Sequence, residues 1–125
     1  MNQQLRCELL HLALVAGGAI PGALLRWQLE LHTGASGSGT LLANLSGCLL
    51  LGMLLAQPPG RTRPYLWGGI GFCGSLTTFS SWMLVLVRHL DAGEPLKVLA
   101  GVSGSLLGGL ALLQLGYLLA RRQRC

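Results

Sequence analysis

Charged residues are scarce in this chain, and acidic residues are the scarcest of all. Of 125 residues only 10% are charged, and Asp and Glu together number four, whereas about one quarter of an ordinary soluble domain is charged. Hydrophobic residues make up 51%, which is more apolar surface than a single small core could bury. The composition therefore argues against a soluble domain and favours an integral membrane protein.

Carboxylates are missing from the centre of every apolar segment. Glu8 and Glu30 flank the first segment, and Asp91 and Glu94 lie in the last connection. Exporters coupled to protons or cations usually carry a carboxylate within the membrane. Its absence, together with an excess of arginine, favours the passage of an anion or a neutral solute.

Cysteine and basic patterns exclude further classes of function. The four cysteines form no CxxC pair, and Cys48 and Cys73 fall inside apolar segments as small hydrophobic residues. They indicate neither a disulfide framework nor a zinc site.

No base or metal-ligand set accompanies a serine, so we do not expect an enzyme. The net charge of +5 comes without aromatic residues interleaved among the basic ones, so we expect no nucleic-acid partner.

Four apolar segments are long enough to cross a membrane, which takes about 20 residues each. They are Leu9–Trp27, Thr40–Ala56, Tyr65–Val87 and Leu96–Ala120, and they use most of the chain. We therefore predict an all-α fold, with residues 1–125 forming one transmembrane domain. Glycines spaced four apart, at Gly18 and Gly22 and at Gly104 and Gly108, indicate close helix packing in a compact, oligomeric bundle.

Basic residues are divided unequally between the two sides of this four-span arrangement. One side carries Arg6, Arg61, Arg63, Arg121, Arg122 and Arg124, and the other carries Arg26, Arg88 and Lys97. Because cytoplasmic loops are enriched in Lys and Arg, the pattern favours both termini in the cytoplasm and a location in the cytoplasmic (inner) membrane, in contact with lipid.

The third segment contains a sequence that disfavours a continuous helix. Residues 71–82 read GFCGSLTTFSSW, with two glycines and five hydroxyl side chains. Glycine leaves the backbone unrestrained, and Ser and Thr compete for backbone carbonyls. Since irregular backbone is tolerated at membrane depth only where it lines a cavity or binds something, this break is a candidate functional site.

Polar side chains elsewhere leave two interpretations open. Asn44 in the second segment either bonds another helix or faces water. Arg26 at the end of the first segment either extends to the interface or forms an electropositive mouth that attracts anions. Around the break, hydroxyl donors and the positive ring edges of Phe79 and Trp82 could replace the hydration of a small anion without a full charge.

Three ordered motifs resemble the Fluc (CrcB) family of fluoride channels. They are GGAIPGALLRW at residues 17–27, GTLLANLSG at 39–47 and GFCGSLTTFSSW at 71–82. In the fourth segment Ser105, Gly109 and Gly116 match the family spacing more loosely. The resemblance covers nearly the whole chain.

The resemblance implies an antiparallel, dual-topology dimer of four-helix protomers, each with a broken third helix. It implies two fluoride pores at the subunit interface and a structural, non-transported Na⁺ on the two-fold axis, held by backbone carbonyls of Gly74 and Thr77. By motif, the pore residues are Asn44, Phe79, Ser81, Trp82 and Ser105, and Arg26 is the vestibule arginine. The implied function is passive fluoride export, which reduces cellular fluoride toxicity.

This chain departs from the family motif at two positions and leaves three alternatives open. Trp82 stands where the family has a second phenylalanine, and Ser75 stands where it has a second glycine. The uneven basic residues allow a heterodimer with a paralogue as well as a homodimer. A small dual-topology, proton-coupled multidrug exporter and a structural subunit that transports nothing are the competing functions.

Overall fold

Helices account for almost all of the computed structural model, which describes residues 2–58 and 60–123. In order they are α1 (Gln3–Thr33), η1 (Gly34–Ser36), α2 (Ser38–Leu55), α3 (Thr62–Pro64), η2 (Tyr65–Cys73), α4 (Gly74–Leu76), α5 (Ser80–Asp91) and α6 (Pro95–Arg122). Four helical stretches among them, Gln3–Thr33, Ser38–Leu55, Thr62–Asp91 and Pro95–Arg122, are long and apolar enough to cross a membrane. The predicted all-α membrane fold is confirmed.

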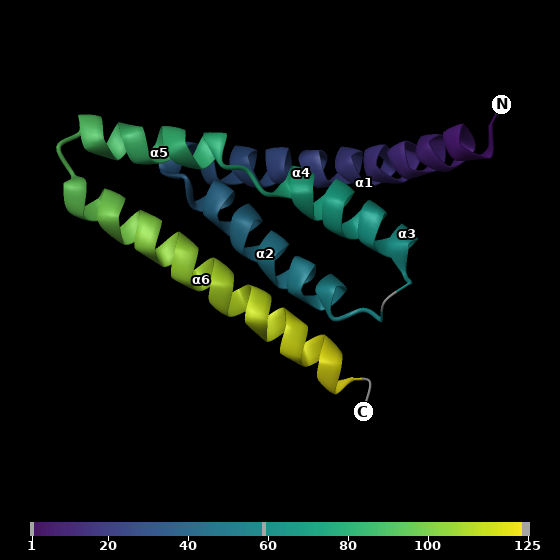
Figure 1. Cartoon of the computed structure of the whole chain (residues 1–125). Coiled ribbons are helices and arrows are strands. Elements are labelled where there is room, and N and C mark those ends of the chain that lie inside the picture. The colour runs from purple at the N-terminus through teal and green to yellow at the C-terminus, as the bar shows by residue number, and fades with distance from the viewer. Residues whose placement is uncertain (1, 59, 124–125) are drawn as a thin grey trace.

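Helix α1 is longer than the first predicted segment. It continues through Pro21 and past Trp27 to Thr33, so the predicted loop at residues 28–39 is largely helical. No glycine or proline interrupts residues 28–33, and the helix ends where Gly34 adopts a positive φ of 62°. The N-terminal part of α1 extends beyond the other helices (Figure 1).

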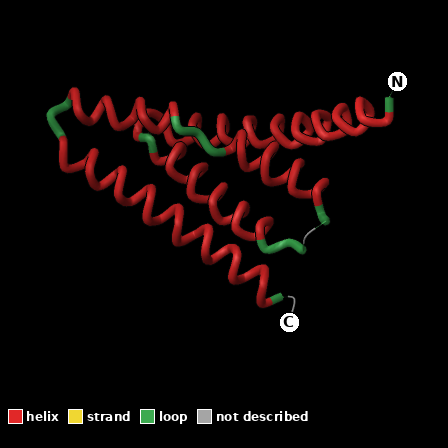
Figure 2. Tube along the Cα trace, viewed as in Figure 1, coloured by secondary structure: helices red, strands yellow, loops and turns green. Residues whose placement is uncertain are grey.

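The third stretch is interrupted between α4 and α5. Residues 77–79 are not helical, and Thr77 has the extended values φ −77° and ψ 146°. Figure 2 shows this interruption as a loop between two helical pieces. Before it, η2 is a nine-residue π-helix, a rare form that often accompanies functional sites. The break therefore lies within the segment that the sequence singled out.

Glycines bring the helix backbones together in two places. A Cβ on Gly18 of α1 would lie only 1.9 Å from the carbonyl oxygen of Trp67, so α1 and η2 meet backbone to backbone. Between α2 and α6, a Cβ on Gly52 would lie 2.0 Å from the Leu113 oxygen, and one on Gly116 would lie 2.2 Å from the Leu49 oxygen. Helix α2 thus packs between α6 and the layer formed by α1 and η2 (Figure 1).

The glycine pair predicted for the fourth segment packs less closely than expected. A Cβ on Gly104 would meet nothing within 4 Å, and one on Gly108 would meet only Leu45. Gly116, which follows them by two to three turns, makes the tight backbone contact instead. The spacing alone could not show which face of α6 meets α2, because glycine lies on both faces.

Replacing Gly116 with alanine is expected to destabilise the protein by about 1–3 kcal/mol, the usual cost of overpacking. The new methyl group would meet a backbone carbonyl of α2, which cannot move aside as a flexible side chain can. The midpoint of thermal unfolding in detergent measures the effect. Gly104→Ala is the matched control on the same helix, and an equal loss in both variants would contradict the assignment.

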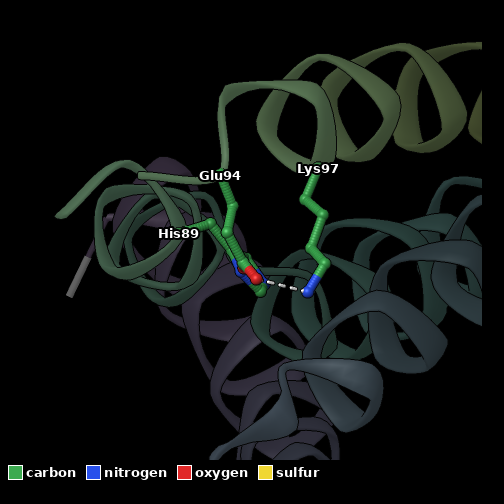
Figure 3. A network of polar contacts seen from close by, with 3 residues as sticks. All are labelled: His89, Glu94 and Lys97. Atoms are coloured by element: carbon green, nitrogen blue, oxygen red, sulfur yellow. Dashed lines mark hydrogen bonds and ion pairs between the residues drawn. The ribbon is translucent and has the colours of Figure 1, made fainter. Parts of the chain in front are cut away.

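The turn between α5 and α6 is fixed by a small polar network at the protein surface (Figure 3). Glu94 Oε1 accepts a hydrogen bond from Lys97 Nζ at 2.6 Å, and Glu94 Oε2 pairs with His89 Nδ1 at 2.8 Å. Hydrogen bonds from Lys97 and His89 lower the pKa of the Glu94 carboxyl. The ionised Glu94 carboxylate therefore stabilises the fold at a pH above the ordinary glutamate pKa. This stabilisation is lost as the pH falls through the lowered pKa of Glu94.

Large apolar side chains cover the outside of the protomer. Leu76 and Ala43 are fully buried, whereas Leu107 and Leu110 of α6 are 68% and 66% exposed. So much exposed apolar surface requires lipid or another protein to cover it. The protomer is therefore built to be surrounded by the hydrocarbon layer or by a partner.

Candidate functional site

A cavity of about 500 Å³ lies along the broken stretch, between α2, η2, α5 and α6. It opens on the face where these elements meet, and its wall combines apolar groups with a few polar ones. The residues that line it are Asn44, Gly47, Cys48, Leu51, Gly69, Cys73, Gly74, Thr77, Thr78, Phe79, Trp82, Met83, Val102, Ser105 and Leu106. A largely apolar cavity with a few convergent polar groups is typical of a binding or conduction site.

Asn44 holds the break in place with two hydrogen bonds. Its Nδ2 donates to the Thr78 carbonyl oxygen at 3.0 Å, and its Oδ1 accepts from the Thr78 backbone N–H at 2.7 Å. The sequence left open whether Asn44 bonds another helix or faces water, and the structure shows that it bonds the third stretch while lining the cavity. A side-chain amide thus supplies the partners that a continuous helix would have given Thr78.

The same contact frees a backbone carbonyl of α4. In a continuous helix the Thr78 N–H would donate to the Gly74 oxygen four residues earlier, but it donates to Asn44. Within the described chain, no hydrogen bond reaches the Gly74 carbonyl oxygen. The Thr77 carbonyl is in the same state, because the Ser81 N–H that would reach it bonds Thr78 Oγ1 at 3.4 Å.

Gly74 and Thr77 also stand on the cavity side of the break. Both line the cavity, whereas their neighbours Ser75 and Leu76 do not. A Cβ on Gly74 would meet only the Gly69 oxygen, at 3.9 Å, so the space beside it is open. Unpaired carbonyl oxygens next to a cavity are the ligands that a hard cation prefers, so the donor set fits the sodium ion that the resemblance implies.

Thr77 and Gly47 fit together at the wall of the cavity. Thr77 directs its hydroxyl back to the Cys73 carbonyl at 2.9 Å, and its methyl group lies over Gly47 of α2. A Cβ on Gly47 would stand 2.4 Å from Thr77 Cγ2, so only glycine lets the break approach α2 this closely.

Phe79 is the most exposed member of the candidate set. Its side chain is 76% exposed at the edge of the cavity, although it is large and apolar. Phe79 therefore contributes little to the packing of its own protomer, and its ring is available to a molecule or ion in the cavity.

Trp82, the first departure from the family motif, packs toward α6. It is only partly exposed and lines the cavity. A Cβ on Gly101 would stand 3.5 Å from Trp82 Cζ2, so the six-membered ring of the indole lies over this glycine. This is an ordinary van der Waals separation, so the ring packs on Gly101 of α6 without a close approach.

Ser75, the second departure, forms a contact that glycine could not. Its hydroxyl donates to the Ala19 carbonyl of α1 at 2.8 Å and also lies 3.2 Å from the Phe72 carbonyl oxygen. Gly22 of α1 makes space for it, because a Cβ there would stand 2.3 Å from Ser75 Oγ. Ser75 therefore ties the break to α1, on the side away from the cavity.

The structure brings most of the predicted site residues to one cavity but leaves two outside it. Asn44, Gly74, Thr77, Phe79, Trp82 and Ser105 line it, whereas Ser81 and Arg26 do not. Ser81 lies in the first turn of α5, where its hydroxyl accepts from Thr78 Oγ1 at 3.5 Å. Arg26 is a partly exposed residue of α1, a helix that contributes nothing to the wall.

Thr78 is the functional residue that sequence reasoning missed. Its backbone receives both Asn44 hydrogen bonds, and its hydroxyl caps the first turn of α5 through Ser81. The paired threonines of residues 77–78 were visible in the motif, but nothing in their spacing indicated which backbone Asn44 would bind.

Comparison with known proteins shows which family this chain resembles over most of its length. The family described as "CrcB-like protein, Camphor Resistance (CrcB)" matches residues 13–117. The chain is 53% identical over 121 residues to a protein of Parasynechococcus marenigrum (strain WH8102) named fluoride-specific ion channel FluC 2, covering 96% of this chain and 88% of that one. It is 42% identical over 116 residues to fluoride-specific ion channel FluC of Stutzerimonas stutzeri (strain A1501), covering 86% and 94%.

Proposed function

Because this chain belongs to the CrcB family, we propose that it is a fluoride-selective channel of the cytoplasmic membrane that exports F⁻ passively. The observation that carries the proposal is the cavity at the break, where Asn44, Phe79, Trp82 and Ser105 meet. The chain is not an enzyme, as its family consists of ion channels.

The cavity offers a fluoride ion weak, distributed contacts. The positive ring edges of Phe79 and Trp82 can contact the ion. The Ser105 hydroxyl donates to the Val102 carbonyl oxygen at 3.0 Å, and it can donate to the ion when it turns away from that oxygen. None of the described residues that line the cavity carries a charge. An ion held only by dipoles and ring edges can both enter and leave.

Export needs no energy source beyond the membrane potential. Moving one elementary charge across the membrane is worth about 2.3 kcal/mol per 100 mV, and a negative interior drives an anion outward. The alternative of a proton-coupled multidrug exporter finds no support in the cavity, since no carboxylate lines it.

A partner chain completes the site in this proposal. The cavity is open on one side, and Phe79 at its edge is 76% exposed, so one protomer does not enclose an ion path. An antiparallel partner, either identical or a paralogue, would cover this face and form two pores with it. Arg26, outside the cavity wall, would then act in the vestibule, and Ser81 would reach the path through its hydroxyl.

Fluoride efflux from liposomes that hold the purified chain tests the function. We expect rapid efflux when a potassium ionophore relieves the charge imbalance, and no comparable efflux of chloride from the same preparation. A fluoride electrode and a chloride electrode measure the two rates. Equal rates for both ions, or no fluoride flux from a folded dimer, would remove the basis for the proposal.

A structural sodium ion is the second part of the proposal, with the carbonyl oxygens of Gly74 and Thr77 as ligands. The ion would supply the electrostatic partner that these oxygens lack within the described chain, and would not be transported. We expect fluoride efflux to fall when sodium is replaced by N-methyl-D-glucamine on both sides of the membrane, and to recover when sodium returns. Flux that is indifferent to sodium would contradict this ligand assignment while leaving fluoride selectivity intact.

A further inference from the structure

A second cavity, of about 400 Å³, lies where α2 and α6 end. It is lined by Met53, Gln57, Pro58, Arg61, Ala120 and Gln123, none of which lines the cavity at the break. Fluoride conduction therefore leaves this second cavity without a role.

The polar part of this cavity suits an oxyanion. Arg61 Nη1 donates to Gln57 Oε1 at 3.4 Å, which keeps the guanidinium beside the cavity. In the described residues the carboxylate ion pairs involve only Glu94, with His89 and Lys97, so Arg61 has no carboxylate partner. A guanidinium presents several N–H donors in a fork that matches phosphate oxygens.

The surrounding charge favours an anion as well. Arg63 lies in α3, and Arg121 and Arg122 occupy the last turn of α6, while α2, α3 and α6 contain no acidic residue. The C-terminal ends of α2 and α6 each contribute roughly half a negative charge. The four positive charges of Arg61, Arg63, Arg121 and Arg122 outweigh these two partial negative charges.

The remaining wall is apolar and belongs to helices that can cross the membrane. Met53 and Ala120 lie near the ends of α2 and α6, both of which are apolar enough to span the bilayer. The cavity thus combines a guanidinium with apolar groups at the ends of two helices that are apolar enough to span the bilayer. Basic pockets that bind anionic lipid headgroups have the same combination.

We propose that this cavity binds a phosphate-bearing anion, and that the ligand is the headgroup of an anionic phospholipid. The phosphodiester lies against Arg61, the side-chain amide of Gln123 contacts the polar headgroup, and the first methylenes of the acyl chains pack on Met53. A free phosphate ion would share the contact with Arg61 but would gain nothing from the apolar wall.

Native mass spectrometry of the purified chain, with phosphatidylglycerol or phosphatidylcholine added, tests the proposal. We expect phosphatidylglycerol to remain bound, and Arg61→Gln to reduce its retention about tenfold, as the loss of a charge-assisted hydrogen bond predicts. The matched control is Arg63→Gln, which removes the same charge two residues away, outside the cavity wall. The Arg63→Gln variant should lose much less phosphatidylglycerol than Arg61→Gln, because Arg63 adds to the surrounding charge but does not line the cavity.

Three results would overturn the proposal. They are equal retention of both lipids, equal losses in the two arginine variants, and binding of inorganic phosphate alone with displacement of phosphatidylglycerol. Should Arg61→Gln fail to fold, Gln123→Leu replaces it, with Gln114→Leu of α6 as its control. Arg61 and Gln123 are exposed, so neither substitution disturbs the buried core.

Discussion

Fluoride efflux is expected to fall at least about 100-fold when Asn44 is replaced by leucine. The leucine side chain has a similar size but can make neither of the two hydrogen bonds to Thr78. Each unpaired backbone group costs about 1–3 kcal/mol, and each 1.4 kcal/mol is a factor of ten. The backbone at the break would move to find other partners, and the freed carbonyls would lose their position beside the cavity.

Liposome flux measured with a fluoride electrode gives the effect of Asn44→Leu. The control is Ser46→Ala, two residues along the same helix, which removes a hydroxyl that bonds only the Ala43 carbonyl of its own helix. Size-exclusion chromatography separates a folded but inactive assembly from an unfolded one. Normal flux in Asn44→Leu would show that the cavity does not depend on this pair of hydrogen bonds.

Phe79→Ile is expected to reduce fluoride efflux by up to about tenfold. An aliphatic side chain has no positive ring edge, and aromatic electrostatic contacts are worth roughly 0.5–1.5 kcal/mol each. Because Phe79 is 76% exposed in the single chain, its replacement should leave the packing within each chain nearly unchanged. Loss of flux without loss of stability is the signature of a residue that contacts the ion.

Leu84→Ile provides the matched control for Phe79→Ile. Leu84 lies on α5, the helix that follows Phe79; it is 53% exposed and lies outside the cavity wall. We expect its flux to match that of the unchanged protein. If both variants conduct normally, Phe79 serves only to cover apolar surface, and the ring-edge contact must come from Trp82 instead.

The sequence predicted the break but not the way in which its polar groups are satisfied. Glycines and hydroxyls in residues 71–82 indicated irregular backbone, and the structure interrupts the helix at residues 77–79. Asn44 lies more than thirty residues earlier in the chain, and a contact over that separation depends on how α2 packs against the third stretch. Glycine at position 47 permits that packing, which no local pattern could reveal.

Several features follow from the sequence by itself. Scarce charge and four long apolar segments require membrane helices, because hydrocarbon tolerates few unpaired polar groups. The three motifs identify the family. The tertiary structure decided which of these residues share a cavity: Asn44, Phe79, Trp82 and Ser105 line it, whereas Ser81 and Arg26 do not. The physical reason is that a helix presents each side chain in one direction, and only the rotation of each helix against its neighbours determines which directions converge.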